Sequence, residues 1–351
     1  MKFHLVSGAC GFVGRNVVKQ LLKRTNDKIL MIDDLSVGIH PKHWLDNFKS
    51  RKEKDMEIIG EDERLYFWQM DIRKFLNKFY ENPEFLKQEY NLECYKISDA
   101  FHFAAIVGGR AKIDGDPMAV ALDLAIDAEF FNWVCKHKPE RVLYPSSSAA
   151  YPNALQTECN AIALKEEMIN VNADYIGKPD MTYGWTKLTG EYLAYIAAKY
   201  YGVSVTCIRP FSGYGEDQDL TYPVPAIADR AARKEDPFVV WGTGQQGRDF
   251  VHIDDVIDCM LLAMDKIHDG SGINIGSGKL TTFLELIEVF TKFASYKPTI
   301  KPLVDKPMGV HSRYSDMSYV KNVLGWEPKI SLEEGMYRVY KKALERINNG
   351  K

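Results

Sequence analysis

Residues 3–18 read FHLVSGACGFVGRNVV, and this stretch decides the fold. Its first five residues are mostly apolar and predict a short buried strand. Three glycines follow at Gly8, Gly11 and Gly14, and apolar residues then recur at helical spacing from about Arg15. A strand, a glycine-rich turn and a helix in this order predict the first unit of an α/β fold.

The glycine-rich turn predicts a phosphate-binding loop. Glycines permit a tight turn and let the backbone approach a pyrophosphate closely, while the N-terminus of the following helix supplies N–H donors. A second glycine-rich match, GTGQQG at 242–247, precedes a strand-like run, so we do not expect a dinucleotide there. In the first loop we expect the dinucleotide to contact Gly8, Gly11, Phe12, Val13 and Gly14.

The next apolar run, KILMIDD at 28–34, ends in two aspartates. A carboxylate after the second strand of such a unit accepts hydrogen bonds from the adenosine ribose and repels a 2′-phosphate. Asp33 is favoured for this contact, and Asp34 is the second candidate. The acidic pair therefore predicts NAD rather than NADP as the cofactor.

Further apolar runs alternate with helical patterns along the chain. The runs lie at 65–71, 99–105, 141–145 and 203–210, and the strongest helical patterns lie at 116–138 and 181–201. Continuous apolar strands between helices predict a Rossmann-type doubly wound parallel sheet that is covered on both faces. We expect an NAD-binding domain at 1–211, to which the chain returns around 239–270, and a smaller C-terminal α/β substrate domain at 212–351.

Composition excludes several classes of protein. The net charge of −3 argues against a nucleic-acid footprint, and no apolar run approaches the ~18 residues that a membrane helix needs. Six cysteines without CxxC spacing predict reduced thiols in a cytoplasmic protein, and we expect no metal site. The charged run at 48–64 is expected to be a solvated surface insertion.

Two motifs carry candidate catalytic groups. YPSSSAAYP at 144–152 places a hydroxyl cluster after a predicted strand, and Tyr183 and Lys187 share one face of the helix predicted at 181–201. A lysine ammonium one turn after a tyrosine stabilises the tyrosinate, which can then act as a general base toward a sugar hydroxyl. The two motifs and the phosphate loop together predict an oxidoreduction site.

These motifs together resemble the extended short-chain dehydrogenase/reductase family, the NAD-dependent nucleotide-sugar epimerases and dehydratases. The likeness covers nearly the whole chain and includes RPFSGYG, GRDFVHIDDV and LGWEP. It implies that Ser147 is the catalytic hydroxyl, that Tyr183 is the base and that Lys187 assists it.

The resemblance also implies roles for residues that spacing alone does not single out. Asp71 and Ile72 are expected at the adenine, and Ala104 and Ala105 beside the nicotinamide. The substrate is expected to contact Ser148, Tyr222 and two arginines that clamp its pyrophosphate, namely Arg248 and Arg313. The helices at 116–138 and 181–201 are expected to pair with their copies in a homodimer.

The reaction implied is an epimerisation through a transient 4-keto sugar, with hydride removed from C4 and returned there. Within the family the chain is most similar to GDP-mannose 3,5-epimerases, which weakly favours GDP. Those enzymes keep a cysteine where this chain has Ala149, and dehydratases keep two acids where it has Ser148 and Ala149. C4 epimerisation needs no such group and is therefore slightly favoured.

Several further functions stay open. Epimerisation at C3 or C5 needs an acid and a base from elsewhere in the chain, for example Cys159, Glu166, Asp219 or Tyr222. A 4,6-dehydratase, a decarboxylase, a net 4-dehydrogenase and an NAD-holding regulatory subunit are also compatible with the family resemblance.

Overall fold

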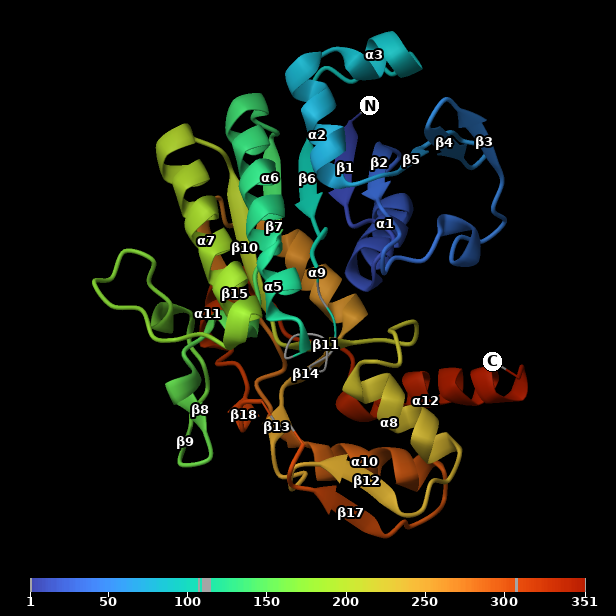
Figure 1. Ribbon diagram of the computed structural model, residues 1–351, viewed down its shortest axis with the longest axis vertical. Helices are drawn as coiled ribbons and strands as arrows, with labels where there is room; N and C mark the ends of the chain where they lie inside the picture. Colours follow the sequence, from blue (N-terminus) through green and yellow to red (C-terminus); the bar gives the residue numbers. More distant parts are fainter. Residues whose placement is uncertain (1, 107, 109–114, 307–308, 351) are drawn as a thin grey trace.

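A nine-stranded sheet forms the centre of the molecule (Figure 1). The computed structural model describes residues 2–106, 108, 115–306 and 309–350. In spatial order the strands are β15 (Asp269–Ile275), β10 (Val205–Pro210), β7 (Arg141–Pro145), β6 (Asp99–His102), β1 (Phe3–Ser7), β2 (Lys28–Asp33), β5 (Leu65–Gln69), β4 (Met56–Ile59) and β3 (Ser50–Glu53). All are parallel from β15 to β5.

Helices cover both faces of this sheet, as the predicted Rossmann-type fold requires. Successive strand residues point to opposite faces, so Leu5 packs in one core with Phe75 and Phe130, and Val6 packs in the other with Met260. The first core is covered by α2 (Ile72–Glu81), α6 (Asp123–His137) and α7 (Met181–Tyr201), and the second by α1 (Phe12–Arg24) and α9 (Ile253–Met264). The continuous apolar strands follow from this double burial.

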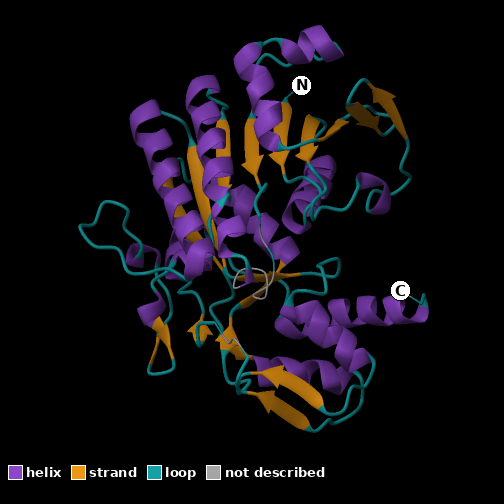
Figure 2. Cartoon of the chain, in the orientation of Figure 1, coloured by secondary structure: helices purple, strands orange, loops and turns teal. Residues whose placement is uncertain are grey.

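A second lobe lies beyond the carboxyl end of the sheet, in the lower part of Figures 1 and 2. It has its own core, which includes Val224, Phe290 and Met336. Its helices are α8 (Pro223–Ala232), α10 (Phe283–Phe293) and α12 (Leu332–Asn348), and its strands are β12 (Phe238–Trp241) and β17 (Ile300–Leu303). The domain boundary at residues 211 and 212 stays a prediction.

Short elements connect the two lobes. β13 (Gly247–Arg248) lies between β16 (Thr281–Thr282) and β18 (Ser312–Arg313), and β11 (Ser212–Tyr214) pairs with β14 (Phe250–His252). The remaining elements are a hairpin of β8 (Gln156–Thr157) and β9 (Asn160–Ala161), and the helices α3 (Phe85–Tyr90), α5 (Pro117–Ala121) and α11 (Ser318–Leu324).

The charged run at 48–64 lies largely on the surface, as expected, and contains a hairpin that the sequence did not indicate. Within it β3 and β4 form an antiparallel hairpin that extends the central sheet beyond β5. β3 is largely exposed and carries Arg51 and Lys52, whereas Met56 and Ile58 of β4 are buried. Charged side chains on an outermost strand commonly protect a sheet edge from pairing with another chain. Here they also hid the alternating pattern by which a strand is predicted from sequence.

Two predicted helix boundaries differ in the structure. The helix expected from about Arg15 begins at Phe12, because the glycine-rich loop continues directly into its first turn. The pattern at 116–138 contains two helices, α5 and α6, which meet at Leu122. By contrast, α7 spans the predicted 181–201 in full.

No helix in the described part of the chain is long and apolar enough to cross a membrane. All six cysteines are free thiols. Cys10, Cys207 and Cys259 are buried, and burial raises the pKa of each thiol.

Candidate active site

The phosphate loop lies where the strand order reverses, between β1 and β6. In open α/β sheets such a switch point forms a crevice at the carboxyl ends of the strands. Gly8 has a φ of +66°, and a Cβ there would lie 2.5 Å from the carbonyl carbon of Phe103. A Cβ on Gly14 would lie 2.1 Å from the Gly8 oxygen. Both positions therefore require glycine, which brings the loop, the loop after β6 and α1 into close contact.

The N-terminus of α1 fits a bound pyrophosphate. Gly11 is its N-cap in an extended conformation, and no side chain of the described residues caps it. Phe12, Val13 and Gly14 form the first turn, whose N–H groups lack partners within a helix and carry the positive end of its dipole. The five predicted loop residues are thus brought together in a cradle suited to the phosphates of NAD.

Asp33 has a structural role that the sequence did not reveal. Its carboxylate is buried and accepts hydrogen bonds from the backbone N–H groups of Cys10 and Leu35, both at 2.8 Å. Burial raises the pKa of Asp33, and these hydrogen bonds oppose the shift. Asp33 thereby holds the phosphate loop against the end of β2, whereas Asp34 is exposed and bonds to Ser36. The predicted ribose contact of Asp33 stays a prediction.

The predicted adenine and nicotinamide residues lie at the same edge of the sheet. Asp71 caps α2 through the N–H of Arg73 at 2.8 Å, and the Arg73 guanidinium lowers the pKa of that carboxyl. Ile72 is buried, and Ala104 and Ala105 are half-buried in the loop that follows β6. Their contacts with the cofactor remain predictions.

The structure brings Ser147 and Tyr183 to one cavity of about 580 Å³. Ser147 follows the end of β7, and its Oγ accepts a hydrogen bond from the Ala149 N–H at 3.1 Å. Tyr183 lies in the first turn of α7. Lys187, one turn later, is buried with its Nζ 5.8 Å from the centre of the Tyr183 ring. Two hydroxyls and one cation are therefore grouped as the predicted mechanism requires.

Asp127, whose charge acts on Lys187, belongs to a buried network of hydrogen-bonded side chains. Asp127 accepts a hydrogen bond from the Tyr144 hydroxyl at 2.6 Å and lies 3.2 Å from Nε2 of His102. Nδ1 of His102 lies 2.8 Å from the Ser7 hydroxyl. Burial by itself would lower the pKa of Lys187, but the charges of Asp127, Tyr183 and Asp123 together outweigh it and the pKa is raised. We had not predicted this role for Asp127, although two aspartates on one apolar helix are an unusual pattern that could have indicated it.

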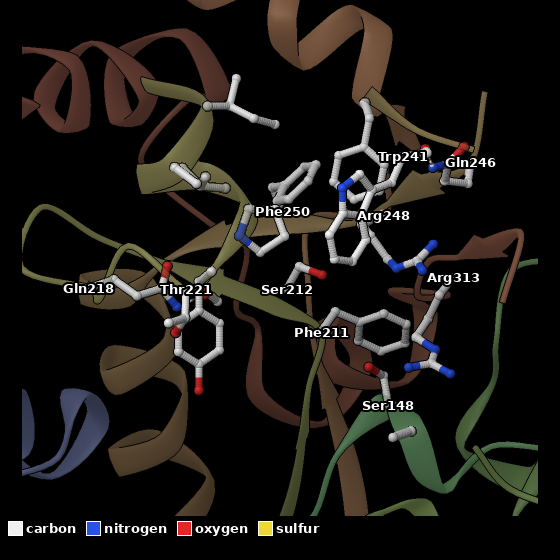
Figure 3. A pocket seen from close by; sticks show the side chains of 18 of the residues that line it. Ser148, Phe211, Ser212, Gln218, Thr221, Trp241, Gln246, Arg248, Phe250 and Arg313 are labelled. Carbon is white, nitrogen blue, oxygen red and sulfur yellow. Dashed lines mark hydrogen bonds between the residues drawn. The ribbon is translucent and has the colours of Figure 1, made fainter. Parts of the chain in front are cut away.

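The two predicted arginines are neighbours in the wall of the same cavity. In the parallel pairing of β13 with β18, Arg248 lies opposite Arg313, and both line the cavity. Figure 3 shows the two guanidinium groups on the same side of the pocket, with Ser148 nearby. The Arg313 guanidinium donates to Asp180 at 2.9 Å and to Gln156 at 2.5 Å. Such paired planar cations suit a diphosphate.

The remaining wall of the cavity contains residues that were not predicted as contacts. Trp241 is 43% exposed and lines it together with Phe250, Ser212, Gln218 and Gln246 (Figure 3). Only the tertiary structure collects these residues, because they come from β11, β12, β14 and the loops beside them.

The second glycine-rich match, 242–247, forms the turn between β12 and β13 and does not precede a helix.

Tyr222 lines the same cavity as Tyr183. Burial raises the pKa of Tyr222 to about 12, and the nearby Tyr183 and Asp219 add to this shift. The loop that carries Tyr222 is attached to α1, because Nε of Arg15 donates to Asp217 at 2.7 Å.

The other candidates for a second acid and base, Cys159, Glu166 and Asp219, are not among the described residues that line the cavity, although Asp219 is near enough to Tyr222 to affect its pKa. Cys159 is exposed in the turn of the β8–β9 hairpin, and Glu166 accepts a hydrogen bond from the Asn274 N–H at 2.9 Å. Among the described lining residues, Asp180 is the only carboxylate, and none is a cysteine, histidine or glutamate. The described wall therefore contains Ser147 and Tyr183 together with Tyr222 and one carboxylate.

Comparisons with known proteins agree with this geometry. The model of the NAD dependent epimerase/dehydratase family matches residues 4–276. The chain is 26% identical to UDP-glucuronate 4-epimerase of Thermodesulfobacterium geofontis, over 99% of this chain and 98% of that protein. It is 28% identical to GDP-mannose 3,5-epimerase of Arabidopsis thaliana, over 74% of this chain and 69% of that protein.

Solved structures share the fold. UDP-glucose 4-epimerase of Thermotoga maritima, solved with UDP-glucose, superposes with a TM-score of 0.77 at 24% identity and covers 99% of both chains.

Proposed function

Because this chain belongs to the NAD dependent epimerase/dehydratase family, whose cofactor is NAD, we propose that it is a nucleotide-sugar epimerase acting through a transient 4-keto sugar. The observation that carries the proposal is one cavity lined by Ser147, Tyr183, Arg248 and Arg313 together. A diphosphate held by the arginines brings the attached sugar into the cavity that the two hydroxyls line.

The residues of the chain have separate tasks in this reaction. Tyr183 takes the proton of the sugar 4-hydroxyl, and Ser147 hydrogen-bonds the same oxygen. Lys187 stabilises the tyrosinate through its positive charge. When NAD is bound, it supplies the acceptor for the C4 hydride and returns that hydride to the sugar. Holding the hydroxyl in register with the cofactor provides much of the rate through orientation.

The two residues that follow Ser147 favour C4 epimerisation over dehydration and over epimerisation at C3 or C5. After oxidation, the keto sugar has to turn and accept hydride on its other face, which requires no further acid or base. Dehydration and C3 or C5 epimerisation require such groups, and Ser148 and Ala149 do not supply them. We therefore place C4 chemistry first, ahead of 4,6-dehydration and net 4-oxidation.

The nucleotide is proposed only as a nucleoside diphosphate. Relatives named for UDP sugars and for GDP sugars both match this chain, so both classes should be assayed. The exposed ring of Trp241 and the neighbouring Phe250 offer an aromatic surface suited to a nucleobase.

The decisive test is incubation of the NAD-loaded protein with UDP- and GDP-hexoses in D₂O, followed by mass spectrometry and NMR of the sugar. We expect a C4 epimer without deuterium and without accumulation of NADH. Deuterium at C3 or C5 would indicate epimerisation at those carbons instead of at C4. Loss of water would indicate a dehydratase, and stoichiometric NADH would indicate a dehydrogenase. No conversion of any sugar would contradict the proposal.

A further inference from the structure

Asp180 occupies the N-cap position of α7, the helix that carries Tyr183. Aspartate at this position commonly accepts a hydrogen bond from the first turn of its own helix. Here, among the described residues, the carboxylate makes no capping hydrogen bond. It accepts one from Nη2 of Arg313 instead, at 2.9 Å and across 133 residues of chain. Among the described residues, the Asp180 carboxylate therefore bonds to a distant arginine and not to the first turn of its own helix.

A second partner holds the same guanidinium. Nε of Arg313 donates to Oε1 of Gln156 at 2.5 Å, and the amide of Gln156 donates to the carbonyl groups of Tyr151 and Pro152, each at 3.1 Å. Gln156 is 1% exposed. Since a guanidinium is planar, two anchored nitrogens set the direction of the whole group.

The backbone of Asp180 also contacts the segments that carry Ser147 and Tyr183. Its N–H donates to the Ala149 carbonyl at 2.9 Å, and its carbonyl accepts from the Gly184 N–H at 2.8 Å. Ala149 belongs to the segment of Ser147, and Gly184 follows Tyr183. One residue therefore contacts the serine segment, the tyrosine helix and the arginine.

We propose that Asp180 is a positioning residue that orients Arg313 toward the substrate diphosphate and sets the distance from that diphosphate to Ser147 and Tyr183. The inference rests on the proposed function, because it assigns the diphosphate to Arg313. Its physical basis is that a charge-assisted hydrogen bond directs the guanidinium before substrate arrives, so less ordering is needed on binding.

The test measures binding of UDP and of GDP to the NAD-loaded protein by calorimetry, in variants that separate charge from hydrogen bonding. Asp180→Ala removes the acceptor and should weaken nucleoside diphosphate binding roughly tenfold to hundredfold, with unchanged affinity for NAD. Asp180→Asn retains an acceptor and should recover most of the loss. Asp174→Ala, which removes an exposed carboxylate from the preceding loop, is the matched control and should bind like the wild type.

A double-mutant cycle distinguishes positioning from a general structural effect. In an Arg313→Lys background, Asp180→Ala should cost little further affinity, because the planar guanidinium that Asp180 orients is absent. An equal loss in both backgrounds, or wild-type binding by Asp180→Ala, would overturn the inference while leaving the proposed function intact. Failure of the wild type to bind either nucleotide would overturn both.

Discussion

At the scale of single residues, Lys187 carries the charge on which the proposed base depends. Asp127 favours that charge because it is itself ionised. Burial alone would raise the pKa of Asp127, but the hydrogen bond from His102 and the charge of Lys187 act against burial, and the pKa is lowered. Burial lowers the pKa of His102, so this ring is neutral near neutral pH. The network then consists of one anion and one cation around a neutral ring, and Lys187 stays protonated over the working range.

Replacing Tyr183 by phenylalanine tests the assignment of the base. We expect Tyr183→Phe to lower kcat by roughly 10²–10⁴-fold, because proton transfer from the sugar hydroxyl is lost while the cavity keeps its shape. Steady-state conversion and the NAD content of the purified protein are the measurements, and NAD should stay bound.

Tyr175→Phe is the control for this prediction, since Tyr175 is 84% exposed and lies away from the cavity. It should leave kcat unchanged. A Tyr183→Phe variant that keeps more than about a tenth of the activity would remove Tyr183 from the role of base.

At the scale of elements, ion pairs join the N-terminal ends of the strands whose carboxyl ends carry the site. Asp99, the first residue of β6, lies 3.0 Å from Nδ1 of His4 on β1 and forms a two-bond ion pair with Arg141 of β7, at 2.7 and 2.9 Å. Burial would raise the pKa of Asp99, but His4 and Arg141 outweigh it and lower the pKa to about 2. These contacts hold together the strands whose far ends carry Gly8, Ala104 and Ser147.

This buried carboxyl predicts a particular loss of stability in acid. A folded pKa of about 2, below an unfolded value near 3.9, contributes stability above pH 4 that disappears as pH falls through about 2. The shift corresponds to about 2 kcal/mol. Urea unfolding at pH 7, 4 and 2.5 should show a lower stability of Asp99→Asn at neutral pH and a flatter acid limb. Parallel pH profiles for wild type and variant would contradict the assignment.

At the scale of the whole molecule, α6 and α7 pack against each other on one face of the sheet (Figure 1). Large apolar side chains are exposed along α5, α6 and α7 and at the junction of α5 with α6. They include Met118, Leu122, Leu124, Trp185 and Tyr192, each between 39% and 75% exposed. Exposed apolar patches of this kind mark association surfaces. The resemblance to the epimerase family assigns this surface to a second copy of the chain, and we propose a homodimer.

Light scattering at micromolar concentration tests the dimer. We expect twice the mass of the chain for the wild type and a monomer for Leu124→Glu, because two copies of the introduced carboxylate would be desolvated at a symmetric interface. Tyr337→Glu changes a similarly exposed side chain in the second lobe and should remain a dimer. A monomeric wild type would refute the proposal.

Sequence by itself determined the glycine-rich turn before α1, the shared helical face of Tyr183 and Lys187 and the alternation of strands and helices. Each depends on local spacing: a glycine where a Cβ has no room, a helical period that places two side chains on one face, or a run of apolar residues long enough for a strand. The family model and the observed sheet confirm the cofactor and the fold.

Only the tertiary structure decided which distant residues meet. The opposition of Arg248 and Arg313 and the pairing of β4 with β5 depend on strand register, and the contact of Asp180 with Arg313 depends on where the N-terminus of α7 lies. Register depends on which strand faces are buried and on turn geometry, so the spacing around these residues does not show it. Ser147 and Tyr183 could therefore be named as candidates from their own segments, whereas the contact of Asp180 with Arg313 could be found only in the folded chain.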